Sequence, residues 1–279
     1  MEIAGISIGS GKPLALIAGL NVIESEVSTL TCAEQVAELA ARHGMPAIFK
    51  ASYDKANRTR ADGFRGPGID LGLEILARVG PATGLPVLTD VHESEQAKRA
   101  AEVVDALQVP AMLCRQTDLL AACAATGKPV NLKKGQFIAA EDFRHAVEKL
   151  ARFGCQDILV TERGTHFGYG DLVVDFRSLV RIREYAPVCF DATHSVQRPG
   201  QRDGASGGDR LLVAPLARAA VASGVDALFI EIHPNPDEAP VDGPCQLTVR
   251  DLDALLTEVR SIEQALDPPP GTSGPATQR

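Results

Sequence analysis

The stretch PVLTDVHESEQAKRAAEVVDALQVPAMLCRQTDLLAACAATGKPVNLK, residues 86–133, holds the pattern that decides the fold. Three short apolar runs (86–91, 106–113 and 129–133) alternate in it with two segments of helical periodicity. The runs are mostly apolar and do not alternate strictly between apolar and polar residues, which is typical of parallel strands that are covered on both faces. This strand–helix–strand–helix–strand order predicts a parallel sheet with helices packed against it.

The same alternation extends through the whole chain of 279 residues. The expected strands are 14–20, 46–51, 86–91, 106–113, 129–133, 157–161, 187–190 and 227–232. The expected helices are 32–43, 68–79, 94–104, 116–126, 141–153, 175–184, 209–223 and 248–265. Eight strand-then-helix units in this length predict an α/β fold, a (β/α)8 TIM barrel. A doubly wound sheet is the alternative, but Gly19-Leu20-Asn21 lacks the glycine-rich fingerprint of its first turn.

The two ends of the chain differ from the repeating part. Residues 3–8 with the turn 9–12 predict a short N-terminal β-hairpin that plugs the bottom of the barrel. Residues 267–279 contain four Pro and two Gly, which predicts a disordered C-terminal tail. We therefore expect a single catalytic barrel domain over residues 1–266.

Composition excludes several classes of function. The net charge of −8 gives no general attraction for nucleic acid or for an anionic membrane. The chain has only twelve aromatic residues and no Trp, which argues against a base-stacking surface. The six cysteines form no C-x-x-C pair, which is typical of reduced, buried thiols. No apolar run approaches the roughly 20 residues of a membrane span. We expect a cytoplasmic protein that acts on small molecules.

Chemistry in such a barrel is expected where strands end and the following loops begin. Six cations stand at these positions: Lys50, Lys55, Arg58, Arg115, Lys133 and Arg163. Like charges held together repel unless an anion fills the space between them. A phosphate ester carries about −1.5 to −2 charges, so six cations suit roughly two phosphates and a carboxylate. The alternative is that some of these side chains point outward or pair with Asp54, Asp90 and Glu162.

A second polar set has the residue types of a metal site: His92, His194, Glu231, His233 and Asp242. The signal is weak alone, because a histidine beside a carboxylate is more often a satisfied hydrogen-bond pair than a metal ligand. The residues by themselves leave the two interpretations open.

Seven strand-end motifs, taken together, resemble the 3-deoxy-D-manno-octulosonate 8-phosphate synthase family. They are Lys50-Ala51-Ser52-Tyr53-Asp54-Lys55-Ala56-Asn57-Arg58, Thr89-Asp90-Val91-His92-Glu93, Arg115-Gln116-Thr117-Asp118-Leu119, Asn131-Leu132-Lys133-Lys134-Gly135-Gln136-Phe137, Glu162-Arg163-Gly164 with Phe167-Gly168-Tyr169, Asp191-Ala192-Thr193-His194-Ser195, and Phe229-Ile230-Glu231 with His233-Pro234. One such motif would be weak, but seven in the same order from about residue 17 to residue 262 are highly specific.

The resemblance implies a barrel enzyme, usually a homotetramer. It would condense phosphoenolpyruvate with D-arabinose 5-phosphate and water, and release inorganic phosphate, to make an inner-core sugar of lipopolysaccharide. Carried over motif by motif, the phosphoenolpyruvate site would comprise Lys50, Lys55, Gln108, Arg115, Lys133 and Arg163. The phosphate of the pentose would bind Asn57, Arg58 and Thr59, with Asp90 near its hydroxyls. Where the family usually has Ser-Ser-Ile-His this chain has Thr59-Arg60-Ala61-Asp62, and Arg60 could add a phosphate contact.

The reaction that the resemblance implies also needs a base for water and an acid for the aldehyde oxygen. We expect Lys133 and His194 in these roles, with Asp242 orienting the water. Residues 196–208, which contain four Gly, are expected to form a lid over the mouth of the barrel.

The family has a metal-dependent branch whose ligands are a Cys, a His, a Glu and an Asp. His194, Glu231 and Asp242 match three of these ligands, but Asn21 stands at the position of the Cys. Asn is a much poorer ligand than a thiolate for a soft or borderline divalent metal. Asn21 therefore predicts an enzyme without a metal or other cofactor, although Lys134-Gly135-Gln136 is more like the metal-dependent branch.

Three other functions are weighed against this one. The related synthase that uses erythrose 4-phosphate has a Lys-Pro-Arg type of motif where this chain has Lys55-Ala56-Asn57-Arg58. A Schiff-base aldolase would use Lys50 or Lys133 as its nucleophile. A phosphosugar-binding barrel without catalysis would bind these ligands and not turn them over.

Overall fold

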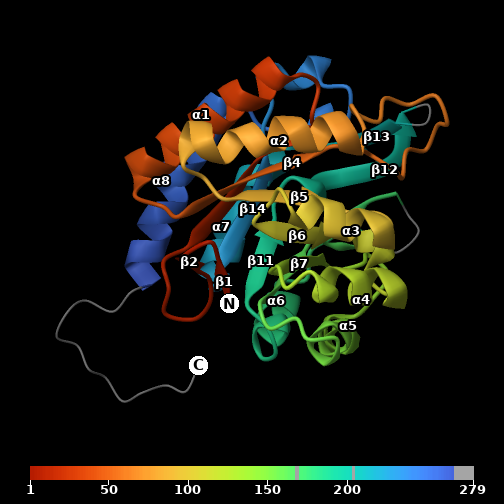
Figure 1. The fold of residues 1–279 in the computed structure, drawn as a ribbon. Coiled ribbons are helices and arrows are strands. Elements are labelled where there is room, and N and C mark those ends of the chain that lie inside the picture. The colour runs from red at the N-terminus through yellow and green to blue at the C-terminus, as the bar shows by residue number, and fades with distance from the viewer. Residues whose placement is uncertain (167–169, 203–204, 267–279) are drawn as a thin grey trace.

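Eight parallel strands close a barrel in the computed structural model, which describes residues 1–166, 170–202 and 205–266. Around the barrel the order is β11 (Val188–Asp191), β14 (Ala227–Glu231), β3 (Ala15–Val22), β4 (Ala47–Ser52), β5 (Val87–Asp90), β6 (Ala106–Val109), β7 (Val130–Lys133) and β8 (Ile158–Glu162). Every neighbouring pair is parallel, and β8 pairs with β11 to close the ring. The predicted (β/α)8 barrel is confirmed (Figure 1).

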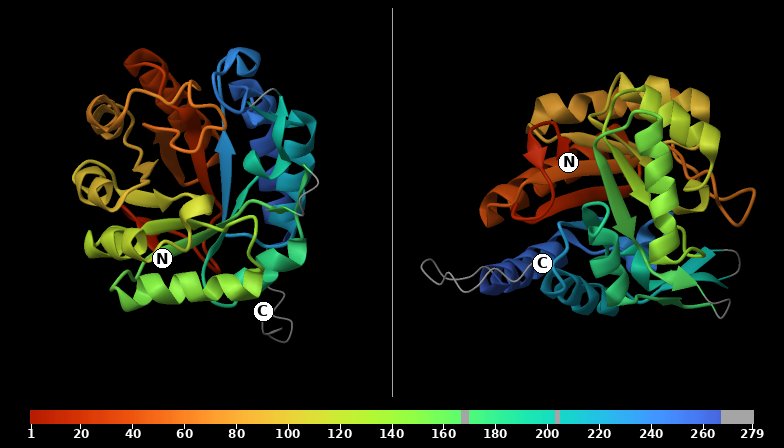
Figure 2. Two further views of the ribbon diagram at one scale, coloured as in Figure 1. Left: turned by 90° about the vertical axis from the view of Figure 1, so that its right-hand side faces the viewer. Right: turned by 90° about the horizontal axis from the view of Figure 1, so that it is seen from below.

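Helices surround the barrel on its outer side, as the view in Figure 2 shows. They are α1 (Glu26–His43), α2 (Ile69–Thr83), α3 (Ser94–Ala101), α4 (Thr117–Ala125), α5 (Ala140–Arg152), α6 (Phe176–Arg183), α7 (Val213–Ala222) and α8 (Val249–Leu266). Their apolar faces pack with the outward side chains of the strands into one large core. Among the described residues, no helix combines the length and the apolar character needed to cross a membrane.

Several predicted boundaries differ from the structure, and two of the differences have a clear local cause. The first helix begins at Glu26 rather than at residue 32, because Ser25 accepts a hydrogen bond from the Ser28 backbone and Ser28 returns one in a capping box. The strand predicted over 106–113 ends at Val109. Pro110 follows it and has no N–H for the sheet ladder, so the chain turns into a 3-10 turn, η1 (Ala111–Leu113).

The predicted N-terminal hairpin is confirmed. Strands β1 (Glu2–Ile3) and β2 (Ile6–Ser7) pair antiparallel at the end of the barrel opposite the strand termini that carry the polar motifs (Figures 1 and 2). Ile3 and Ile8 are buried against the lowest inward-pointing layer of the barrel. This plug closes the bottom, so the barrel opens at the carboxyl ends of its strands.

Side chains inside the barrel form two layers of different character. The lower layer is apolar and consists of Ala15, Ile17, Ile48, Leu88, Ala106, Leu159, Cys189, Ala227 and Phe229. Closer to the mouth, inward positions on seven of the strands are polar: Lys50, Asp90, Gln108, Asn131, Thr161, Asp191 and Glu231 are all buried. The period of two that fills the bottom of the barrel therefore places a polar layer above the apolar one, on the side of the mouth.

A bulge at the end of β3 directs Asn21 toward the mouth. The β3–β4 register shifts between Gly19, which faces Lys50, and Val22, which faces Ser52. Gly19 has φ +155°, and a Cβ at this position would lie 2.1 Å from the carbonyl oxygen of Lys50. Only glycine permits this close approach, so Gly19 places Asn21 beside Lys50.

The segment predicted to be a lid contains regular structure. Strands β12 (Gln197–Arg202) and β13 (Ala205–Gly208) pair antiparallel, so the segment is a β-hairpin rather than an irregular loop. Two further short strands, β9 (Thr165–His166) and β10 (Leu172–Val173), pair in the loop after β8. Lid motion of 196–208 stays a prediction. The predicted tail, 267–279, lies outside the described residues.

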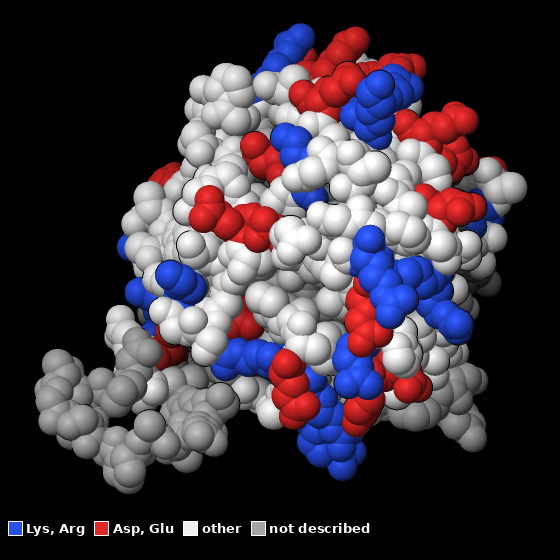
Figure 3. Space-filling view, turned by 60° about the horizontal axis from the view of Figure 1, so that its bottom comes forward, with Lys and Arg blue, Asp and Glu red and all other residues white. Residues whose placement is uncertain are grey.

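The outer surface carries charges of both signs. On the face in Figure 3, Lys and Arg side chains lie beside Asp and Glu side chains. A mixed surface of this kind generates no broad field of one sign that would draw a polyanion to this face.

Candidate active site

The mouth of the barrel holds a continuous network of buried ionisable groups from six strand ends. At one side of it, Lys133 donates a hydrogen bond to Oδ2 of Asp191, and Nδ1 of His194 lies 2.7 Å from the same oxygen. The Lys133 ammonium also lies 3.6 Å from the centroid of the Phe229 ring, a cation–π contact. Asp191 therefore couples the lysine and the histidine that are expected to move protons.

The network continues through Glu231. Nε2 of His194 lies 3.2 Å from Oε2 of Glu231 and 4.0 Å from Oδ2 of Asp242. Asn21 donates to both carboxylates, over 2.5 Å to Glu231 and 3.2 Å to Asp242. The Lys50 ammonium lies 3.0 Å from the other oxygen of Glu231. Asp242 adopts a left-handed backbone, φ +51°, which is a strained conformation for a residue with a side chain.

A second branch of the network leads from Lys50 to Asp90. Lys50 donates to Ser52 over 2.9 Å, Lys55 donates to Ser52 over 3.0 Å, and Ser52 donates in turn to Asp90. Nε2 of His92 lies 3.0 Å from the second oxygen of Asp90. Ser52 thus connects two cations, by hydrogen bonds, to the carboxylate that is expected near the pentose hydroxyls.

Arg163 reaches the same mouth from β8. Its guanidinium donates to the backbone oxygen of His194 over 3.2 Å and to the side chain of Gln197 at the base of the β12–β13 hairpin. Its own backbone N–H donates to Glu162 over 2.9 Å. One guanidinium nitrogen thus donates to both acceptors, and it links the predicted lid to the barrel.

Burial and charge act against each other on these groups. Burial opposes the charge on Lys50, but Glu231 and Asp90 outweigh it and raise the pKa of the lysine. For Lys133, burial wins over the attraction of Asp191 and lowers the pKa. Burial likewise opposes ionisation of Asp191, but His194 and Lys133 hold its pKa far below the usual range. The most easily deprotonated lysine of the pair is therefore Lys133.

The expected cations pair with carboxylates that the sequence did not single out as partners. Lys50 pairs with Glu231 and Lys133 pairs with Asp191, both through buried contacts. Of the three carboxylates considered as alternatives, Asp54 pairs with Arg65, Glu162 lies 3.4 Å from Lys134, and only Asp90 comes near a site lysine, 4.0 Å from Lys50. An incoming anion must compete with Glu231 and Asp191 for these lysines.

The remaining predicted binding residues lie outside this network. Asn57 and Thr59 are exposed on the long loop between β4 and α2, and Arg58 is half-buried there with its Nε enclosed and without a hydrogen-bond partner among the described residues. Arg60 is exposed and pairs with Asp62. This loop and the β12–β13 hairpin lie at the same end of the barrel (Figures 1 and 2).

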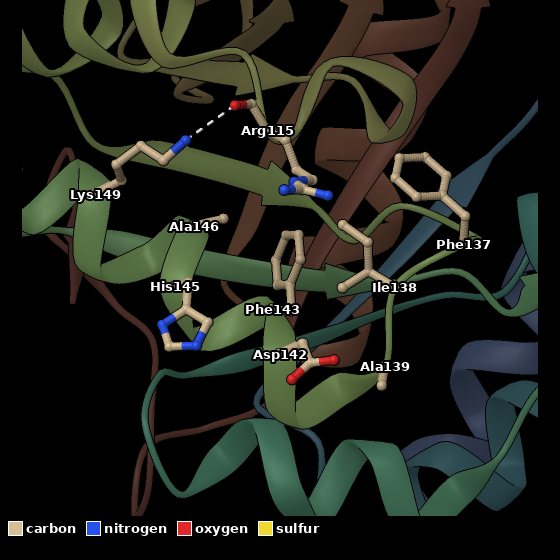
Figure 4. Close-up of a pocket in the computed structure, with 9 residues that line it drawn as sticks. All are labelled: Arg115, Phe137, Ile138, Ala139, Asp142, Phe143, His145, Ala146 and Lys149. Carbon is tan, nitrogen blue, oxygen red and sulfur yellow. Dashed lines mark hydrogen bonds between the residues drawn. The ribbon is translucent and has the colours of Figure 1, made fainter.

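Arg115 is exposed and lines a separate cavity of about 380 Å³ between the ends of β6 and β7 and helix α5. Figure 4 shows its guanidinium beside Ile138 and Phe143, with Phe137 and Lys149 at the edges. None of the network residues lines this cavity. The structure therefore does not bring Arg115 together with Lys50, Lys133 and Arg163.

The group around Asn21 does not fit a divalent metal. The amide nitrogen of Asn21 donates to both Glu231 and Asp242, so a hydrogen-bond donor stands between the two carboxylates that would have to be ligands. An amide N–H has no lone pair to offer a cation, and the thiolate that a borderline metal prefers is absent from this position. His194 further turns Nδ1 to Asp191 and Nε2 to Glu231, as in a hydrogen-bonded pair.

Three residues of the network were not among the predicted site residues: Asp191, Ser52 and Phe229. Asp191 and Ser52 end β11 and β4, and they occupy inward positions two residues beyond Cys189 and Lys50. Counting inward positions one residue past the predicted strands 46–51 and 187–190 would have found both. Phe229 belongs to the apolar layer below, and only the fold brings it to Lys133.

Known proteins resemble the chain along nearly its full length. The profile of the DAHP synthetase I family matches residues 1–267. A 2-dehydro-3-deoxyphosphooctonate aldolase of Geobacter sp. (strain M21) is 53% identical over 264 residues, which cover 94% of this chain and 97% of the relative. The enzymes of the same name from a Cyanothece species (55% over 262 residues, 94% of this chain and 96% of the relative) and a Synechococcus species (54% over 268 residues, 96% and 94%) are equally similar. The chain belongs to the DAHP synthetase I family and, within it, to the 2-dehydro-3-deoxyphosphooctonate aldolases.

Proposed function

We propose that this protein condenses phosphoenolpyruvate with D-arabinose 5-phosphate and water, giving 3-deoxy-D-manno-octulosonate 8-phosphate and inorganic phosphate. Four cations, Lys50, Lys55, Lys133 and Arg163, converge on one mouth of the barrel, and this convergence supports the proposal best. Two anionic substrates must be held against each other in this reaction. Orientation and charge stabilisation then supply most of the acceleration.

The bonds change in three steps. The enol carbon of phosphoenolpyruvate attacks the pentose aldehyde, whose oxygen takes up a proton, and positive charge develops at the carbon that bears the phosphate. Water adds to that carbon and loses a proton. The C–O bond to phosphate then breaks and inorganic phosphate leaves with the bonding electrons. The new hydroxyl gives its proton to the departing phosphate, and the carbon becomes a ketone. No covalent bond to the protein is required.

Lys133, Asp191 and His194 suit the two proton transfers. Lys133 has a lowered pKa and shares Asp191 with His194, so either group can give or take a proton through small movements. A substrate anion that draws Lys133 away from Asp191 removes part of what stabilises the carboxylate charge, which makes Asp191 more basic toward His194. We assign Asp242, which lies 4.0 Å from His194, to orienting the attacking water.

The side-chain oxygen of Asn21, in the same network as His194 and Asp242, is available to accept a hydrogen bond. This Oδ1 is enclosed and finds no partner among the described residues. A water molecule between Asn21, His194 and Asp242 would satisfy this oxygen, since a buried carbonyl without a partner costs about 1–3 kcal/mol. We assign Asn21 to holding the reacting water, without a metal or other cofactor.

Three further properties belong to this proposal. The enzyme functions in lipopolysaccharide inner-core biosynthesis in the cytoplasm, it is a homotetramer, and it needs no metal. The amide between Glu231 and Asp242 supports the last of these. Thr59 and Asn57, both exposed on the β4–α2 loop, would contact the pentose phosphate together with Arg58.

Isotope transfer tests the reaction itself. Phosphoenolpyruvate labelled with oxygen-18 at the bridging C–O–P oxygen is converted with arabinose 5-phosphate, and the inorganic phosphate is examined by ³¹P NMR. Because the C–O bond breaks, the label is expected in the phosphate. Unlabelled phosphate would mean P–O cleavage and a different reaction, and ligand binding without phosphate release would indicate a barrel that only binds phosphosugars.

A further inference from the structure

A chain of uncharged polar groups crosses three adjacent strands just inside the mouth. The hydroxyl of Thr161 on β8 donates to Oδ1 of Asn131 on β7 over 2.5 Å, and Nδ2 of Asn131 donates to Oε1 of Gln108 on β6 over 3.0 Å. Thr161 and Asn131 are completely buried, and Gln108 is 5% exposed. Neither Asn131 nor Thr161 reaches the mouth, so their effect on a substrate must act through Gln108.

The bonds in this chain all run in one direction. Thr161 has one hydroxyl proton and uses it for Oδ1 of Asn131, which leaves the Asn131 amide nitrogen for Gln108. The Gln108 carbonyl oxygen is the acceptor of this bond. Nε2 of Gln108 has no partner among the described residues and is not enclosed.

We propose that Asn131 and Thr161 are positioning residues that fix the flip of the Gln108 side-chain amide, so that Gln108 presents N–H donors to phosphoenolpyruvate. The inference rests on the proposed function, which places Gln108 in the phosphoenolpyruvate site. An amide has two nearly isosteric ends that behave oppositely toward an anion. The nitrogen end donates to a carboxylate or phosphate, whereas the oxygen end repels it.

At a buried site, the end of the amide that faces the ligand strongly affects the affinity for an anion. A hydrogen bond to a charged group contributes roughly 1.5–3 kcal/mol, which corresponds to about 10- to 100-fold in affinity. The barrel selects the productive end through neutral groups on neighbouring strands, and these groups add no charge next to the lysines. Asn131 and Thr161 therefore determine the preference for an anion at this position through Gln108, without touching the ligand.

Asn131→Asp reverses the amide. A carboxylate at this position accepts from Thr161 and has no proton for Gln108, so the Gln108 nitrogen turns inward to it and the oxygen turns to the mouth. We expect the affinity for phosphoenolpyruvate, measured by titration calorimetry, to fall about 10- to 100-fold. In a Gln108→Leu background the same Asn131→Asp change is expected to alter affinity less than about 3-fold. An equal loss in both backgrounds would show a direct effect of the added charge and would overturn the proposal, as would no loss in either.

Thr161→Val supplies a test without added charge. Valine keeps the shape of threonine but removes the donor to Asn131, so the flip of Asn131 is no longer fixed. We expect the KM for phosphoenolpyruvate to rise about 3- to 10-fold with the KM for arabinose 5-phosphate unchanged, and Thr161→Ser to restore the wild-type value. Equal changes in both KM values, or no rescue by serine, would mean a purely structural role. Wild-type protein that binds phosphoenolpyruvate but does not turn it over would contradict the proposed function and leave the calorimetric comparison intact.

Discussion

The side-chain amide of Asn21 donates a 2.5 Å hydrogen bond to Oε2 of Glu231, and a second bond of 3.2 Å joins it to Asp242. One amide nitrogen thus separates two carboxylates that would otherwise face each other, and it does so without a cation. Lys50 neutralises the other oxygen of Glu231. The arrangement holds two acidic groups close to the expected position of the reacting water.

Wild-type protein is expected to keep its turnover number after exhaustive chelation, with a metal content far below one ion per chain. Asn21→Cys supplies the missing thiolate beside His194, Glu231 and Asp242, and we expect it to bind about one Zn²⁺ per chain. Asn21→Ala is the control and should bind none. Metal analysis of the three dialysed proteins decides the point; a wild-type stoichiometry near one, with activity lost on chelation, would contradict the account.

Lys133→Ala is expected to lower the turnover number by about 100- to 10,000-fold, the usual size of a lost acid–base group. The loss should exceed any change in KM, because Asp191 and His194 also lose the proton partner that they share. Lys98→Ala, on the exposed side of α3, is the control. A turnover number that Lys133→Ala leaves unchanged would remove Lys133 from the proton transfers, and borohydride trapping of substrate on the wild type would indicate a Schiff base instead.

Two arginines on the β4–α2 loop should differ sharply in their effect on the pentose. Arg58 has an enclosed Nε without a partner among the described residues, whereas Arg60 is exposed and held by Asp62. Arg58→Ala is expected to raise the KM for arabinose 5-phosphate about 10- to 100-fold and to change that for phosphoenolpyruvate little. Arg60→Ala should leave both nearly unchanged. Steady-state kinetics with each substrate varied separately will distinguish them, and equal effects of the two substitutions would argue against a phosphate contact at Arg58.

Glu231 is expected to make the free energy of unfolding depend on pH in the acidic range. Burial opposes its ionisation, but His194, Lys50 and Lys55 outweigh burial and lower its pKa from 4.5 to about 2. The carboxylate therefore stabilises the folded protein fully above about pH 4.5, and this contribution is lost as the pH falls toward 2. Glu231→Gln removes the proton uptake, so the free energy of unfolding should fall less steeply between about pH 4.5 and 2, by up to about 1.4 kcal/mol per pH unit.

Urea unfolding at several pH values measures this slope. Glu38→Gln, on the exposed side of α1, controls for the substitution itself. An acid dependence in Glu231→Gln as steep as in the wild type would show that Glu231 is not held ionised by its neighbours.

The sequence could predict the barrel because a doubly covered strand leaves a strong signal. Apolar runs such as 86–91 and 227–232 stand between segments of helical periodicity, and their composition indicates that they are buried. The start of α1 was missed because Ser25 and Ser28 form a capping box without the usual acidic third residue. The hairpin over 196–208 was missed because its glycine-rich strands carry no alternating pattern.

The sequence could predict many of the residues of the site, but not which of them pair with each other. Lys50 and Lys133 stand at strand ends, and the fold alone decides that their carboxylate partners are Glu231 and Asp191, 181 and 58 residues away. Motif order could not show that Arg115 lines a separate cavity, because a strand end fixes where a side chain starts and not where it points. Gln108 was assigned to a substrate, but the flip of its amide depends on Asn131, a contact between strands.

Consumption of phosphoenolpyruvate in the presence of arabinose 5-phosphate, after exhaustive chelation and without added metal, tests the central claim most directly. The account predicts full activity, with one phosphate released for each phosphoenolpyruvate consumed, and none when erythrose 4-phosphate replaces the pentose. Turnover with erythrose 4-phosphate alone would mean that the Lys55–Arg58 motif selects a shorter sugar, and no turnover with either aldehyde would contradict the assigned reaction.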